Sequence, residues 1–148
     1  MPWLIPKPLP DEAQRSIDRF IDELAKRLDD PAQGRNQVVR ETLAQVMHGR
    51  TWQELVDSAP MAALALDPDN VTFEAERYVV TDQERFARVK PPLWLWKCLD
   101  LTPLGQSLST GLPLRAMLAR RIFRKVGRNI KIFQNVEVSV GCNIGAGD

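Results

Sequence analysis

Residues 126–148, VGRNIKIFQNVEVSVGCNIGAGD, carry the spacing that decides the fold. Aliphatic residues stand six apart in this stretch, at Val126, Ile132, Val138 and Ile144. Small or aliphatic residues follow the first three of them by four positions, at Ile130, Val136 and Cys142. A period of six fits neither the 3.6-residue turn of a helix nor the two-residue alternation of a flat strand. Short hexapeptide repeats are typical of a parallel β-helix, whose stacked coils bury their inward residues against one another.

Two ordinary strands over residues 129–133 and 136–140, joined by Gln134 and Asn135, are the alternative source of this spacing. The four glycines between residues 127 and 147 favour coils, because tight corners need positive φ angles. The chain supplies three full hexads and part of a fourth. We therefore expect only the first coils of a β-helix, and an incomplete form of its domain.

A particular junction leads into the hexads. The predicted helix LRAMLARRIFRKVG, residues 114–127, runs directly into VGRNIK, then IFQNVEV, and then the Gly-x-Asn-Ile segment at residues 141–144. This stretch, from about residue 113 to 148, resembles the hexapeptide-repeat acyltransferases, and most of all the maltose, galactoside and capsular-polysaccharide O-acetyltransferase branch. The region before it, positions 1–110, matches no family in the same way, and it is longer than the short helical segment usual there.

The resemblance implies a homotrimer of left-handed β-helices, provided that the β-helix is completed, with active sites between subunits. Acetyl-CoA or another acyl-CoA would donate its acyl group to a hydroxyl of a sugar or related small molecule. A histidine on a later coil would take the hydroxyl proton, a role that suits a group with a pKa near neutral. By the same resemblance Asn143 would line the acceptor site. The alternative for Asn143 is a coil corner, where asparagine tolerates left-handed backbone.

The single histidine, His48, precedes the hexads and is expected to sit structurally at a helix C-terminus beside Gly49. No catalytic residue or CoA-contacting residue is therefore assigned, and we expect the chain as given to be inactive. Cys142 is expected to be a small core residue. A non-enzymatic module that binds a protein or a membrane surface is the alternative function. A γ-class carbonic anhydrase, which shares the β-helix, has no support, because its metal needs histidine ligands in the coils.

Composition places the chain among ordinary globular proteins. It has 148 residues, a net charge of +1, 44% hydrophobic and 26% charged residues. The two cysteines, Cys98 and Cys142, match no metal motif or disulfide framework and suit a reducing compartment, so we expect a cytoplasmic protein without a metal. No segment approaches the roughly 20 apolar residues that span a bilayer.

Residues 1–110 are expected to be a mainly helical region that begins with a proline-rich arm, residues 1–10. Trp3, Leu4 and Ile5 of the arm are expected to pack on a neighbouring surface. Helices are predicted from Asp11 as N-cap to about residue 28, from 36 to 48, and after the capping-box pair Thr51 and Glu54. A short strand is expected within residues 71–80, and a loop-rich apolar segment over residues 90–114.

A connecting basic helix is expected over residues 111–125, with Pro113 in its first turn. Seven cations and no acid lie between residues 115 and 131: Arg115, Arg120, Arg121, Arg124, Lys125, Arg128 and Lys131. Three interpretations remain open: a solvated face paired with the acidic first helix, contact with an anionic membrane or glycan, and, least favoured, nucleic-acid binding. The predicted class is thus α+β, with a helical region (1–110), this helix (111–125) and the start of a β-helix (126–148).

Overall fold

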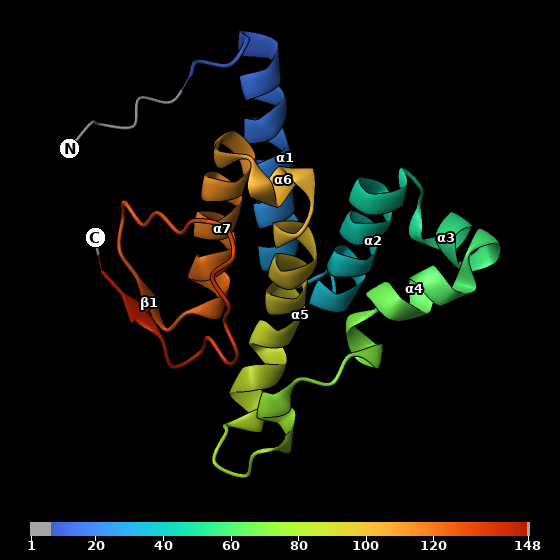
Figure 1. The fold of residues 1–148 in the computed structure, drawn as a ribbon. Helices are drawn as coiled ribbons and strands as arrows, with labels where there is room; N and C mark the ends of the chain where they lie inside the picture. The colour runs from blue at the N-terminus through green and yellow to red at the C-terminus, as the bar shows by residue number, and fades with distance from the viewer. Residues whose placement is uncertain (1–6, 148) are drawn as a thin grey trace.

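The computed structural model describes residues 7–147, and it is a helix-rich α+β structure (Figure 1). Its longer helices are α1 (Asp11–Asp29), α2 (Arg35–His48), α5 (Gln83–Asp100) and α7 (Leu108–Ile122). Shorter ones are α3 (Trp52–Ser58), α4 (Pro60–Leu66), α6 (Pro103–Gln106) and the 3-10 turns η1 (Pro68–Asn70) and η2 (Glu74–Arg77). Two strands, β1 (Lys125–Val126) and β2 (Gly145–Ala146), follow. The expected packing of Trp3, Leu4 and Ile5 lies outside the described residues.

The first three helices follow the sequence pattern closely. In α1 the apolar stripe turns Leu24 and Leu28 into the core. Asp11 is its first helical residue, not its N-cap, because Pro10 holds the capping position. Gly49 ends α2 at a φ of +64°, and its N–H donates to the carbonyls of Ala44 and Gln45. The capping box of Thr51 and Glu54 forms at the start of α3 as predicted.

The predicted strand over residues 71–80 is wrong, because the structure forms the 3-10 turn η2 there. Phe73 at its edge stacks edge-on against Phe86 and Trp94 of α5, with ring centroids 6.1 and 6.0 Å apart. These aromatic contacts pack Phe73 against α5, so the segment needs no neighbouring strand to bury this side chain.

The expected loop over residues 90–114 is also wrong. Residues 83–100 form α5, which continues through Pro91 and Pro92, and α7 begins at Leu108. A proline inside a helix leaves the carbonyl four residues earlier without its N–H partner. For Pro92 that carbonyl belongs to Arg88, and the Nη1 of Arg35 donates to it over 2.9 Å. A side chain from α2 thus replaces the hydrogen bond that the proline removes.

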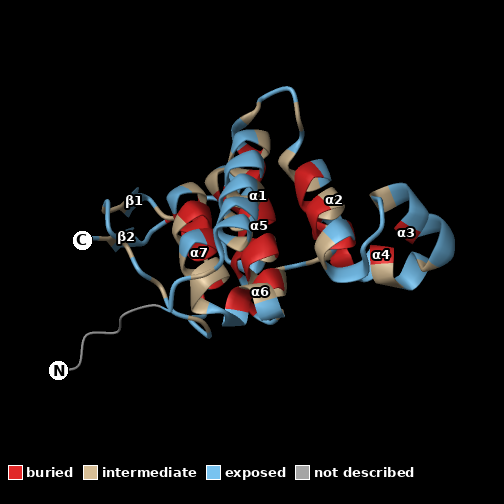
Figure 2. Cartoon of the chain, turned by 90° about the horizontal axis from the view of Figure 1, so that it is seen from above, coloured by how far each residue is buried: buried red, intermediate tan, exposed pale blue. Residues whose placement is uncertain are grey.

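The core forms around α5, which lies between α2 and α7 (Figure 1). Figure 2 shows the buried residues on the facing sides of these helices. Burial of Leu93, Leu95 and Leu99 explains why α5 carries apolar residues on more than one face. The basic helix predicted over 111–125 is observed as α7 over residues 108–122, so Pro113 lies in its interior and not in its first turn.

The C-terminal segment leaves α7, makes one excursion and returns to pair with itself. β1 and β2 pair in parallel, with Lys125 opposite Gly145 and Val126 opposite Ala146. Arg124 N–H donates to Ile144 O and Gly127 N–H donates to Ala146 O, each over 2.9 Å. The return from Lys125 to its partner Gly145 is slightly longer than three hexads. We call residues 125–147 the coil.

The hexad positions are only partly inward. Val138 and Cys142 are buried, whereas Val136 and Ile144 remain 44% and 38% exposed. The alternative of two strands over 129–133 and 136–140 is wrong, because neither stretch is a strand. The structure therefore has a parallel return at the place where coils were expected, but it does not have a formed β-helix within the described residues.

Candidate functional site

A buried ion pair joins the helices to the coil. Arg115 on α7 is 2% exposed, and its Nη1 donates to Asp100 Oδ1 at the end of α5 over 2.6 Å. Arg115 is one of the seven cations for which a solvated face was one of the open interpretations, and its burial excludes that interpretation for this residue. Its burial is possible because the carboxylate of Asp100, itself 7% exposed, compensates the charge.

The side chains of Arg115 and Asp100 also form hydrogen bonds with the backbone of the coil, at the turn that contains Ile132 and Asn135. Arg115 Nε donates to the carbonyl of Ile132 over 2.6 Å, and the backbone N–H of Asn135 donates to Asp100 Oδ2 over 2.9 Å. Asn135 has a φ of +64°, which asparagine accepts more easily than most residues. The coil is thus anchored by hydrogen bonds between side chains of the helices and its own backbone.

Glycines let the helices approach the guanidinium. A Cβ on Gly111 would lie 2.3 Å from the carbonyl oxygen of Gly105 and 2.8 Å from Arg115 Nη2. The close approach lets Gly105 O accept from Arg115 Nη1 over 2.8 Å. On the coil side, Gly141 has a φ of +75°, and a Cβ there would lie 2.2 Å from Cγ2 of Ile122. Glycines therefore allow both close contacts, that of α6 with α7 around Arg115 and that of the coil with Ile122 of α7.

Asn143, the residue that the resemblance assigned to an acceptor site, lies exposed in the turn just before β2. The turn is closed by the N–H of Ile144, which donates to Gly141 O over 2.8 Å. His48 is exposed at the end of α2, and α2 and β1 lie on opposite sides of α5 (Figure 1). The structure thus does not bring the histidine and Asn143 together.

The cysteines are not reactive groups in this structure. Burial raises the pKa of the Cys98 thiol to about 12, so that it stays protonated at neutral pH. Cys142 is 2% exposed and contributes to the core, as the sequence predicted. Residues 7–147 contain no group of three or more side chains that could hold a metal ion.

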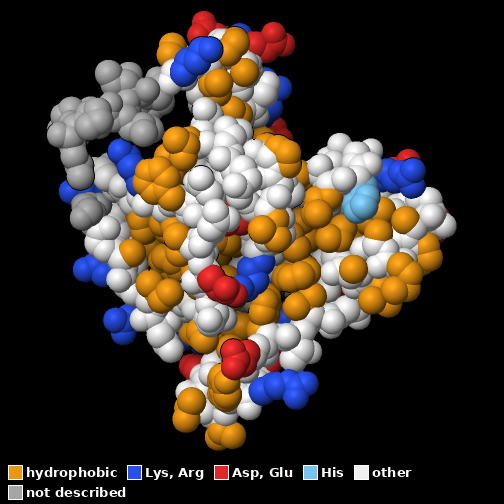
Figure 3. All heavy atoms as spheres, viewed as in Figure 1, with side chains coloured by type: hydrophobic (Ala, Val, Ile, Leu, Met, Phe, Trp, Pro, Cys, Tyr) orange, Lys and Arg blue, Asp and Glu red, His pale blue; other side chains and the backbone are white. Residues whose placement is uncertain are grey.

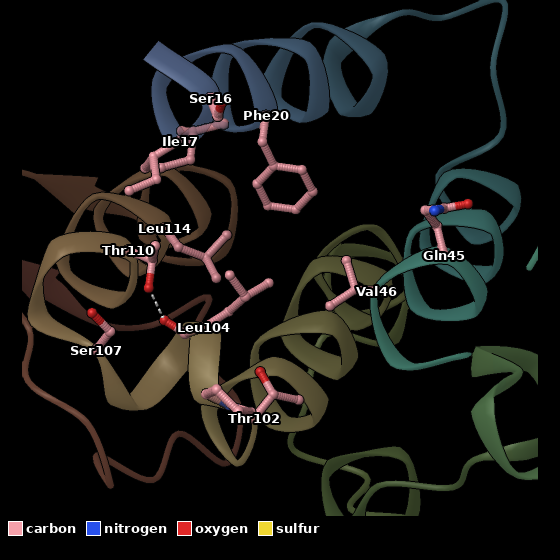
Figure 4. A pocket seen from close by; sticks show the side chains of 12 residues that line it. Ser16, Ile17, Phe20, Gln45, Val46, Thr102, Leu104, Ser107, Thr110 and Leu114 are labelled. Carbon is pink, nitrogen blue, oxygen red and sulfur yellow. Dashed lines mark hydrogen bonds between the residues drawn. The ribbon is translucent and has the colours of Figure 1, made fainter. Parts of the chain in front are cut away.

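An apolar groove opens between the first half of α1, the end of α2, α6 and the start of α7 (Figure 4). Its volume is about 660 Å³. Its apolar walls come from Ile17, Phe20, Ile21, Val46, Pro103, Leu104 and Leu114, and its polar lining from Ser16, Gln45, Thr102, Ser107 and Thr110. None of these side chains is charged. Ile17, Phe20 and Ile21 belong to the apolar stripe of α1, and only the helix arrangement shows that they border a groove.

Five cations at the end of α7 and on the coil form what we call the basic surface: Arg120, Arg124, Lys125, Arg128 and Lys131. All are exposed, and none forms an ion pair with another described residue. Figure 3 shows Lys and Arg side chains along the edge where α7 and β1 lie in Figure 1. The expected pairing with the first helix holds for Arg121, whose guanidinium binds the Asp29 carboxylate.

Comparison with known proteins gives no relative. No protein-family model, no curated protein and no solved structure matches the chain. No helix among residues 7–147 is long and apolar enough to cross a membrane.

Proposed function

We propose that this chain is the opening part of a cytoplasmic acyltransferase of the hexapeptide-repeat kind, which moves an acyl group from acetyl-CoA or another acyl-CoA to a hydroxyl of a sugar or related molecule. The observation that carries the proposal is the parallel pairing of β1 with β2, which sets Lys125 opposite Gly145. A chain that returns parallel to itself after about three hexads offers a free strand edge on which a further coil can stack.

In this proposal the helices are a platform and the coil is the first turn of a left-handed β-helix. The Arg115–Asp100 pair fixes the coil to the platform. Asn143, exposed in its turn, would contact the acceptor. The coil contains no histidine, so the proposal leaves the group that takes the hydroxyl proton unassigned. The proposal therefore assigns no catalytic residue and no CoA contact to residues 7–147.

Assembly is the first test. We expect the chain to form a trimer of three times its 16.8 kDa mass in size-exclusion chromatography with light scattering. Val138 is 4% exposed in the coil, and V138D should abolish the trimer, whereas V79D, at a fully exposed position before α5, should keep it. A monomeric wild-type chain, or a trimer that survives V138D, would contradict a β-helix assembly.

Activity is tested on the longest reading frame that contains this chain. Release of the CoA thiol from acetyl-CoA is followed with a panel of sugars. We expect N143A to lower acyl transfer at least about tenfold, an effect typical of a lost substrate-positioning contact. The control variant S139A changes another exposed polar side chain of the coil and should stay near wild type. If no hydroxyl accepts an acyl group, the proposed activity is wrong.

Contact with an anionic membrane surface is a second candidate, because the five cations of the basic surface lack acidic partners among residues 7–147. Each cation near such a surface contributes about 1 kcal/mol to binding. The double variant K125Q/R128Q should therefore weaken binding to phosphatidylglycerol vesicles about 30-fold. R77Q/R88Q, which removes two exposed cations elsewhere, should change it less than about threefold. Equal binding to phosphatidylcholine vesicles would contradict this candidate.

A further inference from the structure

The apolar groove between α1, α2, α6 and α7 is of a size and character that binds an apolar group. Its volume of about 660 Å³ falls among those of small-molecule and peptide sites. Its polar atoms are hydroxyls and one amide, and at least one of them is already satisfied, since Thr110 Oγ1 donates to the carbonyl of Leu104 (Figure 4). A charged ligand would find no counter-charge in this lining.

We propose that the occupant is the chain's own arm, residues 1–6, seated in the groove through Trp3, Leu4 and Ile5. The sequence of this segment, MPWLIP, joins three large apolar side chains to prolines at both ends. It precedes α1 closely, and the first turns of α1 supply Ser16, Ile17 and Phe20 to the groove. The apolar character of the arm thus matches the uncharged lining of a groove that begins only a few residues further along the chain.

The length of the arm allows this placement. Leu4 lies seven positions before Asp11, and an extended, proline-rich chain covers about 3.1 Å per position, or about 22 Å. Along α1, Ile17 and Ile21 lie about 9 and 15 Å from Asp11. An arm that turns back at the start of α1 therefore spans the groove. Residues 7–10 run from the start of α1 toward the side on which α7 lies (Figure 1), and Leu9 is the one of them that is partly buried.

The chemistry of the arm favours docking over a separate ligand. Prolines restrict the undocked chain, so less conformational entropy is lost when it binds. A tethered segment also has a millimolar effective concentration at a neighbouring site, so weak apolar contacts suffice. Burial of a tryptophan and two aliphatic side chains stabilises the docked state through the hydrophobic effect.

Cross-linking tests the position of the arm. In L4C/V46C a short bismaleimide should bridge the arm to the groove wall within one chain, detected by intact mass. The natural cysteines stay in place, because the pKa of Cys98 is raised to about 12 and Cys142 is 2% exposed. L4C/V56C places the second thiol at an exposed position on α3 and should react at least about tenfold more slowly. Equal rates for the two pairs, or bridges only between chains, would overturn the proposal.

A dye provides the second readout. Deletion of residues 2–6 should open the groove and raise the fluorescence of the uncharged dye Nile red several-fold, with unchanged far-ultraviolet circular dichroism. Ile17 forms part of the groove wall and is only partly buried, and the additional change I17D should cancel the gain. If the deletion leaves dye binding unchanged while the helices stay folded, the arm does not cover the groove.

Discussion

Replacement of Asp100 by alanine is expected to lower the free energy of unfolding by about 3–5 kcal/mol. The change leaves the guanidinium of Arg115, 2% exposed, without its carboxylate. It also removes the acceptor for the backbone N–H of Asn135, so the coil loses a contact at the same time. Urea denaturation followed by circular dichroism measures the loss.

The matched control is D29A, which removes the carboxylate that pairs with Arg121 at a position 55% exposed. An exposed ion pair contributes only about 0–1 kcal/mol to stability. Comparison of D100A with D29A therefore distinguishes the effect of burial from the effect of losing an ion pair. A loss below about 1 kcal/mol in D100A would show that Arg115 finds another environment in the variant, and the buried pair would then not be the anchor of the coil.

The double variant D100L/R115M should recover most of the stability lost in D100A. Apolar residues of similar volume in place of a buried ion pair are often neutral or stabilising. Recovery is favoured here because Arg115 Nη2 is buried without a hydrogen-bond partner among the described residues, so the guanidinium is not fully satisfied. The coil should nevertheless be looser, since the carbonyl of Ile132 loses its donor. Faster hydrogen exchange in residues 130–140 measures that loosening.

The parts of the fold that follow local rules were predictable from sequence. The stripe of α1, the left-handed Gly49 after α2 and the capping box of Thr51 depend only on residues close in the chain. The period of six likewise indicated that the chain returns parallel to itself, and β1 and β2 pair in that way. The coil departs from an ideal hexad pattern, because its return is slightly longer than three hexads and Val136 and Ile144 turn outward.

Other parts depend on partners distant in sequence and could not be predicted. Pro91 and Pro92 argued against a helix, but Arg35 of α2 satisfies the carbonyl that Pro92 leaves free. Arg115 stood among six other cations with no local sign that it is buried, since its partner Asp100 lies 15 residues earlier. The groove arises only from the arrangement of four helices. Asn143 lies in the turn before β2, and its role in substrate binding stays a prediction.

Gly105 explains why α6 and α7 can close over the ion pair. It is buried in α6, directly after the turn at the end of α5. A Cβ at this position would lie 2.4 Å from both Asp100 Cα and the carbonyl oxygen of Leu99. These are backbone atoms of the helix that forms the centre of the core, so they cannot move aside as a flexible side chain would.

G105A is therefore expected to destabilise the chain by about 3 kcal/mol, as overpacking of a tight backbone contact does. To admit the methyl group, α6 must shift away from α5, and the carbonyl of Gly105 then retreats from Arg115 Nη1, to which it now lies 2.8 Å away. The matched change G145A adds a methyl group where no atom lies within 4 Å, and it should cost less than about 0.5 kcal/mol. Urea denaturation of the two variants gives the comparison. Equal stabilities would mean that α6 does not rest on the backbone of α5, and the junction that seats the Arg115–Asp100 pair would be wrong.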